Sequence, residues 1–190
     1  AKSDEKTTND LRIQEYNMLR LSSQIAAEDY IDIRFRMPSG EDYIVVSKKK
    51  VEIPQIDGVD SATTIWLQLT EDEILTMSNA IVENYMIEGS VLYTAKYVEP
   101  GTQEKATPTY VPSEEVQNLL RNNDSNILNT AKLALLTRYQ GNSDVRNNIN
   151  NTKNSIDPDD VATNISTGVK QEASTAQEQR QDYLDALSGN

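Results

Sequence analysis

The spacing of apolar residues changes within the first fifty positions, and this change predicts a helix followed by two strands. Between Asn9 and Asp29 the apolar residues recur mostly every three or four positions, which predicts an amphipathic helix capped by Asn9. Over residues 30–47 the segment "YIDIRFRM" alternates apolar with charged residues, and "DYIVVS" follows it after the turn sequence "PSG". This second pattern predicts a β-hairpin with one buried and one solvated face.

A helix over residues 70–88 has the clearest local signals. Thr70 and Glu73 have the spacing of a capping box, and Gly89 follows as a stop. The preceding residues 51–64 contain a proline and a glycine and have little period, so we expect a loop with at most a short edge strand.

The segments after this helix predict further elements. "SVLYTAKYV" is rich in β-branched and aromatic residues, which suits a strand paired with the hairpin, but its pattern leaves strand and helix both open for residues 90–98. Two helices are expected within residues 113–139, the first opened by Ser113, with the sequence "NND" as the break between them.

The last quarter of the chain is polar. Residues 141–190 consist mainly of Asn, Ser, Thr, Asp and Gln with scattered valines and isoleucines, and so have little apolar surface for a core. We expect an extended polar C-terminal arm with a possible helix at 171–187. Residues 1–140 then form one compact domain. The expected fold class is α+β, mainly helical: a small domain with a β-hairpin or short sheet, several helices and a long extended C-terminal arm.

Composition and charge argue against several classes of protein. The formal net charge of the 190 residues is −12 and the cations are dispersed, which argues against sequence-specific nucleic-acid binding. The chain has no cysteine and no histidine, so it lacks thiolate and imidazole metal ligands and the commonest general base. No apolar run approaches the roughly 20 residues of a membrane span, and "AKSDEKTTND" is charged where a signal peptide is apolar. We expect a soluble, non-exported chain without cofactor or metal.

The charged clusters have simpler explanations than catalysis. Acidic residues at 71–73 and 114–115 fall where helix amino termini favour negative charge. Residues 157–160 lack the glycine and distal glutamate of a calcium loop, so a turn that begins a helix is favoured over a cation site. Lys48–Lys50 suit the protection of a sheet edge better than contact with phosphate or an acidic partner. No enzymatic activity is therefore expected.

A connector containing three prolines carries the strongest hint of function. In "KYVEPGTQEKATPTYVPSEEV", residues 96–116, Pro100 and Gly101 suit a type II turn, and the later prolines favour extended backbone. Such a strap forms few internal hydrogen bonds, so either its own domain or a neighbouring subunit must order it. Together with the arm, it gives the candidate partner-binding residues Tyr97, Pro100, Pro108, Tyr110, Val111, Pro112, Val161, Ile165 and Val169.

A longer stretch resembles a known family. The run "IWLQLTEDEILTMSNAIVENYMIEGSVLYTAKYVEPGTQEKATPTYVPSEEVQNLLRNNDSNIL", residues 65–128, resembles structural proteins of crAss-like tailed bacteriophages, in which an "LxLTEDE" helix leads into "YVEPG" and "PTYVP". The resemblance implies a virion component of the portal–tail region, where rings of identical subunits join the portal to the tail; a capsid-associated position is the other reading.

The expected function is therefore structural. We expect a non-enzymatic subunit of an oligomeric ring or connector, with other copies of itself and other virion proteins (portal, neighbouring ring or tail proteins) as partners. Its location would be the virion, and the host cytoplasm during assembly. Removal of residues 142–190 is expected to leave a folded monomer that does not assemble. The alternatives are a capsid-decorating or assembly-chaperone binding module and, as a third, a hydrolase that relies on Glu or Asp alone.

Overall fold

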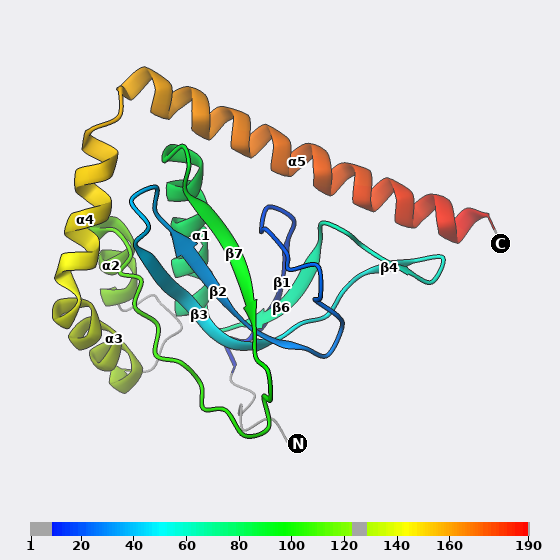
Figure 1. The fold of residues 1–190 in the computed structure, drawn as a ribbon, viewed down its shortest axis with the longest axis horizontal. Coiled ribbons are helices and arrows are strands. Elements are labelled where there is room, and N and C mark those ends of the chain that lie inside the picture. Colours follow the sequence, from blue (N-terminus) through cyan, green and yellow to red (C-terminus); the bar gives the residue numbers. More distant parts are fainter. Residues whose placement is uncertain (1–8, 123–128, 190) are drawn as a thin grey trace.

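The computed structural model describes residues 9–122 and 129–189, and it places a small sheet and its helices in an α+β arrangement (Figure 1). Helical residues make up about 45% and strand residues about 22% of the described residues. The strands are β1 (Arg12–Tyr16), β2 (Tyr30–Arg36), β3 (Asp42–Lys50), β4 (Gln55–Ile56), β5 (Val59–Asp60), β6 (Ile65–Leu69) and β7 (Val91–Lys96). The helices are α1 (Glu71–Met86), α2 (Glu114–Arg121), α3 (Asn129–Gly141), α4 (Ser143–Asn154) and α5 (Pro158–Ser188).

The central sheet has the strand order β3-β2-β7, with both pairs antiparallel. Strands β2 and β3 form the hairpin expected over residues 30–47. Strand β7 settles the question left open for residues 90–98, since it pairs with β2 along its whole length. The β2–β3 register shifts on either side of Ile33, and Lys48 adopts a φ of 49° on the opposite strand. This irregularity turns the Asp32 side chain toward the backbone of Lys48.

The helix predicted between Asn9 and Asp29 is wrong. This stretch contains β1, which pairs antiparallel with β6, followed by turns. Farther along, the backbone of Arg20 exchanges hydrogen bonds with Leu92 and Thr94 at the outer edge of β7, at 2.9 and 3.2 Å. Two strand edges thus gain backbone partners that a helix would not supply, and this tertiary pairing overrides the helix-like spacing.

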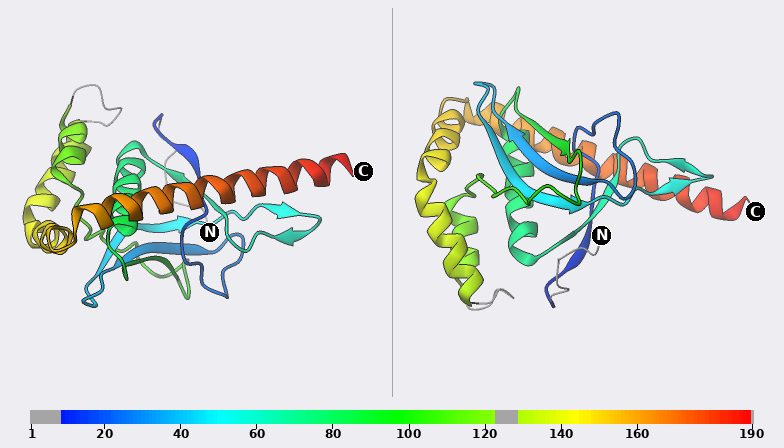
Figure 2. Two further views of the ribbon diagram at one scale, coloured as in Figure 1. Left: turned by 90° about the horizontal axis from the view of Figure 1, so that it is seen from above. Right: turned by 60° about the horizontal axis from the view of Figure 1, so that its bottom comes forward.

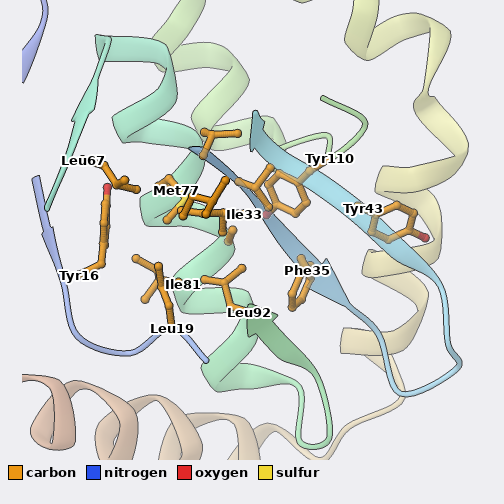
Figure 3. Close-up of a cluster of buried hydrophobic side chains, with 14 of the residues drawn as sticks. Tyr16, Leu19, Ile33, Phe35, Tyr43, Leu67, Met77, Ile81, Leu92 and Tyr110 are labelled. Atoms are coloured by element: carbon orange, nitrogen blue, oxygen red, sulfur yellow. The ribbon is translucent and has the colours of Figure 1, made fainter. Parts of the chain in front are cut away.

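Helix α1 lies against the sheet and carries the centre of the core (Figure 3). It begins as predicted, because the Thr70 N–H donates to Glu73 Oε1 at 3.0 Å. Met77 on α1 is fully buried, and Phe35 of β2 meets the Tyr110 ring edge-on at a centroid distance of 5.9 Å. The core also contains Tyr16, Leu19, Ile33, Leu67, Ile81 and Leu92.

The expectation of an extended arm over residues 141–190 is corrected by two helices. Helix α4 buries Ile149 completely in the main core, so residues 143–154 belong to the body of the domain. Helix α5 is 31 residues long, which corresponds to about 46 Å, and it contains no buried residue. It crosses α1 and runs on beside the β4–β5 hairpin, away from the end formed by α2, α3 and α4 (Figures 1 and 2). The possible helix at 171–187 is thus the second half of α5.

Candidate assembly surface

The strap, residues 97–112, is ordered by its own domain. The amides of Thr109 and Tyr110 both donate to the carbonyl oxygen of Ile44 in β3, at 2.9 and 3.0 Å. In return the Ile44 amide donates to Thr109 Oγ1 at 2.9 Å. These bonds place the strap along the outer edge of the central sheet. The sequence left open whether the strap is ordered by its own domain or by a neighbouring subunit. In this structure its own domain provides the hydrogen-bond partners.

Tyr97 fastens the start of the strap. Its hydroxyl donates to Asp32 Oδ1 at 2.6 Å and accepts from the Ala106 amide at 3.2 Å. Burial and the Asp32 hydrogen bond raise the pKa of Tyr97. The Lys48 ammonium lies 5.9 Å from the Tyr97 ring centroid and donates to the Gln103 carbonyl at 2.6 Å. Tyr97 therefore connects the strap to β2 and β3 within the chain.

The proline positions of the strap differ in exposure. Pro100 and Pro108 are half-buried, while Pro112 and Val111 are buried, the latter with Leu120 of α2 in a second apolar cluster. The type II turn predicted at Pro100-Gly101 is wrong. Gly101 does not have positive φ, and the amides of residues 102 and 103 both donate to the Glu99 carbonyl at 3.0 Å, as in a helical turn.

Tyr110 leads into a buried polar cluster beneath α4. Its hydroxyl hydrogen bonds to Glu83 of α1, whose side chain is 1% exposed. Arg146 of α4 donates to Glu83 Oε1 at 3.0 Å and to Oε2 at 2.5 Å, and also to the Val111 carbonyl at 3.1 Å. Lys153 Nζ lies 2.9 Å from Glu83 Oε2. One carboxylate thus holds together α1, the strap and α4.

The pKa values in this cluster follow from burial and charge. Burial alone would raise the pKa of Glu83, but the hydrogen bonds and positive charge of Arg146 outweigh it, and the pKa is lowered. Burial, followed by the Glu83 carboxylate, raises the pKa of Tyr110 well above its ordinary value. Glu83 is therefore ionised and neutralised in place, which suits a structural fastening better than a general acid.

Helix α5 touches the body at a few points. At Gly168 the helix backbone passes so close to the Tyr85 ring that an added Cβ would lie 2.4 Å from ring carbons. The Tyr85 hydroxyl donates to Glu172 Oε2 at 2.7 Å, and Asn17 Nδ2 donates to the Glu172 backbone carbonyl at 3.0 Å. Farther along, the Ser61 hydroxyl donates to Gln179 Oε1 at 3.0 Å.

The three arm residues singled out from the sequence lie within about 80° of one another around α5 but differ in exposure. Val161 and Ile165 are half-buried, whereas Val169 is 49% exposed. Three larger apolar residues near the end of the helix were not predicted from the sequence: Tyr183, Leu184 and Leu187, which are 51%, 43% and 58% exposed. Their spacing of three and four in "DYLDAL" was the available signal.

A groove of about 650 Å³ runs between the β4–β5 hairpin and the second half of α5. Its apolar lining comes from Ile56, Val59, Ala62 and Ala186. Its charged lining consists of four carboxylates, Asp57, Asp60, Asp182 and Asp185. No lysine or arginine lines the groove, and none of the four carboxylates is in an ion pair with a described residue.

Two features are absent from residues 9–122 and 129–189. These residues contain no cluster of acidic, histidine or cysteine side chains able to hold a metal ion. Among the same residues, no helix is long and apolar enough to cross a membrane. No family model matches the chain, and neither a curated protein nor a solved structure matches it.

Proposed function

We propose that this protein is a non-enzymatic structural component of a tailed-bacteriophage virion, a subunit of an oligomeric ring or connector in the portal–tail region. The observation that carries the proposal is helix α5, which is 31 residues long, has no buried side chain and exposes apolar residues near its end. Exposed apolar surface on a long element is typical of an interaction site. The sequence resemblance over residues 65–128 supplies the kind of particle.

The chain consists of a folded body and a long helix, α5, and this arrangement suits a structural role in an assembly. The buried Glu83–Arg146 pair fixes α4 to α1, and α5 follows α4 directly in the chain, so α5 starts from a rigidly held helix. A subunit with a rigid body and a projecting helix can repeat one heterologous contact around an axis until the ring closes. The net charge of −12 would discourage a passing genome from sticking to such a ring.

Two measurements test the proposal. Mass photometry of the purified full chain over a range of concentrations should show one closed oligomer, which negative-stain images should show as a ring. Quantification of the protein in purified particles should give a small fixed copy number. Hundreds of copies per particle would instead indicate a capsid-decorating protein. A chain absent from particles and monomeric at every concentration would overturn the proposal.

The matched control is a variant that ends at Asp157 and therefore lacks α5. It keeps the Glu83–Arg146 pair and Ile149, so its body should remain folded by circular dichroism and thermal unfolding. We expect this variant to be monomeric under the conditions in which the full chain assembles. An assembled Asp157-terminated variant would show that α5 is not the assembling element.

A further inference from the structure

We infer that the two sides of α5 are complementary, and that an apolar stripe on one side docks into the groove of a second copy of this chain. The stripe is defined by Val169, Ala173, Arg180, Tyr183, Leu184 and Leu187. The inference rests on the proposed function, because it names the contact through which copies would join.

The stripe residues share one exposed side of α5. Residues 169, 173, 180, 183 and 187 are separated by four, seven, three and four positions, which keeps them on one side of the helix, and all six stripe residues are exposed. From Val169 to Leu187 the stripe extends over about 27 Å of helix. Within the described part of the chain, no element covers it.

The stripe and the groove lie on different sides of the same helix. At about 100° per residue, Asp182 and Asp185 point roughly 140° and 160° away from Leu187. Both aspartates line the groove on the hairpin side. One copy therefore cannot close its own stripe onto its own groove.

The charge of the stripe is complementary to the charge of the groove. The groove carries four aspartates and no cation in its lining. The stripe contains Arg180, and Lys170 follows Val169 on the same helix. No described residue forms an ion pair with either cation. Docking would bring Arg180 to the carboxylates and would bury Leu187 against the apolar lining of the groove, which contains Val59.

Such a contact is heterologous, because each copy offers a stripe to one neighbour and a groove to the other. Repetition of a heterologous contact gives a closed ring or an open filament. A stripe that paired with the stripe of a second copy would instead stop at dimers.

Charge exchange in the full chain tests the inference. Mass photometry or sedimentation velocity would give the concentration at which half of the chain is assembled. We expect Arg180→Glu and Asp182→Lys each to raise this concentration about tenfold, and Leu187→Asp to raise it about a hundredfold. The double variant R180E/D182K should return to within about threefold of wild type, because both sides are then reversed. Val98→Asp, at a strap residue that is 86% exposed, is the matched control and should have no effect.

A mixing experiment separates stripe–groove from stripe–stripe contact. L187D disrupts the stripe but keeps the groove, and D182K weakens the groove but keeps the stripe. A mixture of the two variants should therefore form pairs that neither variant forms alone. Unchanged assembly of all variants, with a wild type that still forms rings, would overturn this inference and leave the proposed function standing. Failure of the mixture to pair would also overturn it. A wild type that is monomeric and absent from particles would overturn both.

Discussion

The guanidinium of Arg146 on α4 pairs with both carboxylate oxygens of Glu83 on α1, at 3.0 and 2.5 Å, and both side chains are almost completely buried. The two residues are 63 positions apart in the sequence. Glu83 also accepts from the Tyr110 hydroxyl, and Arg146 also donates to the Val111 carbonyl. These contacts join the polar C-terminal part of the chain to the core. Helix α4 is therefore part of the folded body.

We predict that Arg146→Met lowers the free energy of unfolding by about 3 kcal/mol, because it leaves the Glu83 carboxylate buried with only Lys153 and the Tyr110 hydroxyl as partners. Urea unfolding followed by circular dichroism measures the change. The double variant E83Q/R146M should lose less than the sum of the two single variants. Lys96→Met, which removes the more exposed pair with Asp29, is the control and should have little effect. Additive losses in the double variant would contradict the prediction.

Acid should weaken the same contact. The pKa of Glu83 is lowered in the folded protein from its ordinary value of 4.5. Its contribution to stability is therefore complete above pH 4.5 and is lost as the pH falls through the lower, folded-state pKa. We predict that the wild type loses more unfolding free energy than Glu83→Gln as the pH falls below 4.5. Urea unfolding at a series of pH values tests this, and parallel curves would refute it.

Gly168→Ala should destabilise the docked position of α5, although alanine is the better helix former by about 1 kcal/mol. Its Cβ would overlap the Tyr85 ring, which costs about 1–3 kcal/mol unless the helix moves. We expect faster amide exchange in α5 and a net loss of stability of about 1 kcal/mol. Gly141→Ala is the control, because no atom lies within 4 Å of its added Cβ. Equal stabilisation by both substitutions would contradict the close contact.

Two truncations should differ in outcome. A chain that ends at Asp157 should fold, whereas one that ends at Gly141 loses Ile149 and Arg146 and exposes the core beneath α4. We predict cooperative thermal unfolding for the first and a loosely packed or aggregating product for the second. The second expectation replaces the one drawn from the sequence, that removal of residues 142–190 leaves a folded monomer. Cooperative unfolding of the shorter chain would restore it.

The strap should be ordered in the isolated chain. The amides of Thr109 and Tyr110 donate to β3, so we predict slow hydrogen exchange at both positions in the monomeric Asp157-terminated variant. Tyr97→Phe removes the hydrogen bond to Asp32 and should cost about 1–2 kcal/mol of unfolding free energy. Exchange at Thr109 and Tyr110 at the rate of an unstructured peptide would mean that a partner orders the strap.

Local signals predicted the parts of the fold that depend on neighbouring residues. The capping box of Thr70 and Glu73 located α1, and the alternation in "YIDIRFRM" located β2. The N-terminal stretch was predicted incorrectly because its spacing fits a helix, while its actual partners, β6 and β7, lie about fifty or more residues away. Strand pairing at that distance leaves no local trace.

The candidate surface was predictable only in part. Proline and tyrosine positions indicated the strap, but not the edge of β3 against which it lies. Ile149 is a single apolar residue among asparagines, so its complete burial gives almost no periodic signal. Arg146 matters because of a carboxylate on another helix, and one sequence contains no information about that pairing.

The way in which the strap lies on β3 affects how copies of this chain can meet at high concentration. The amides of Thr109 and Tyr110 already donate to the Ile44 carbonyl, and Pro108 and Pro112 have no amide proton. A foreign strand arriving at this margin would find few donors with which to extend the sheet. Amyloid-like stacking of copies on this side of the sheet is thereby disfavoured.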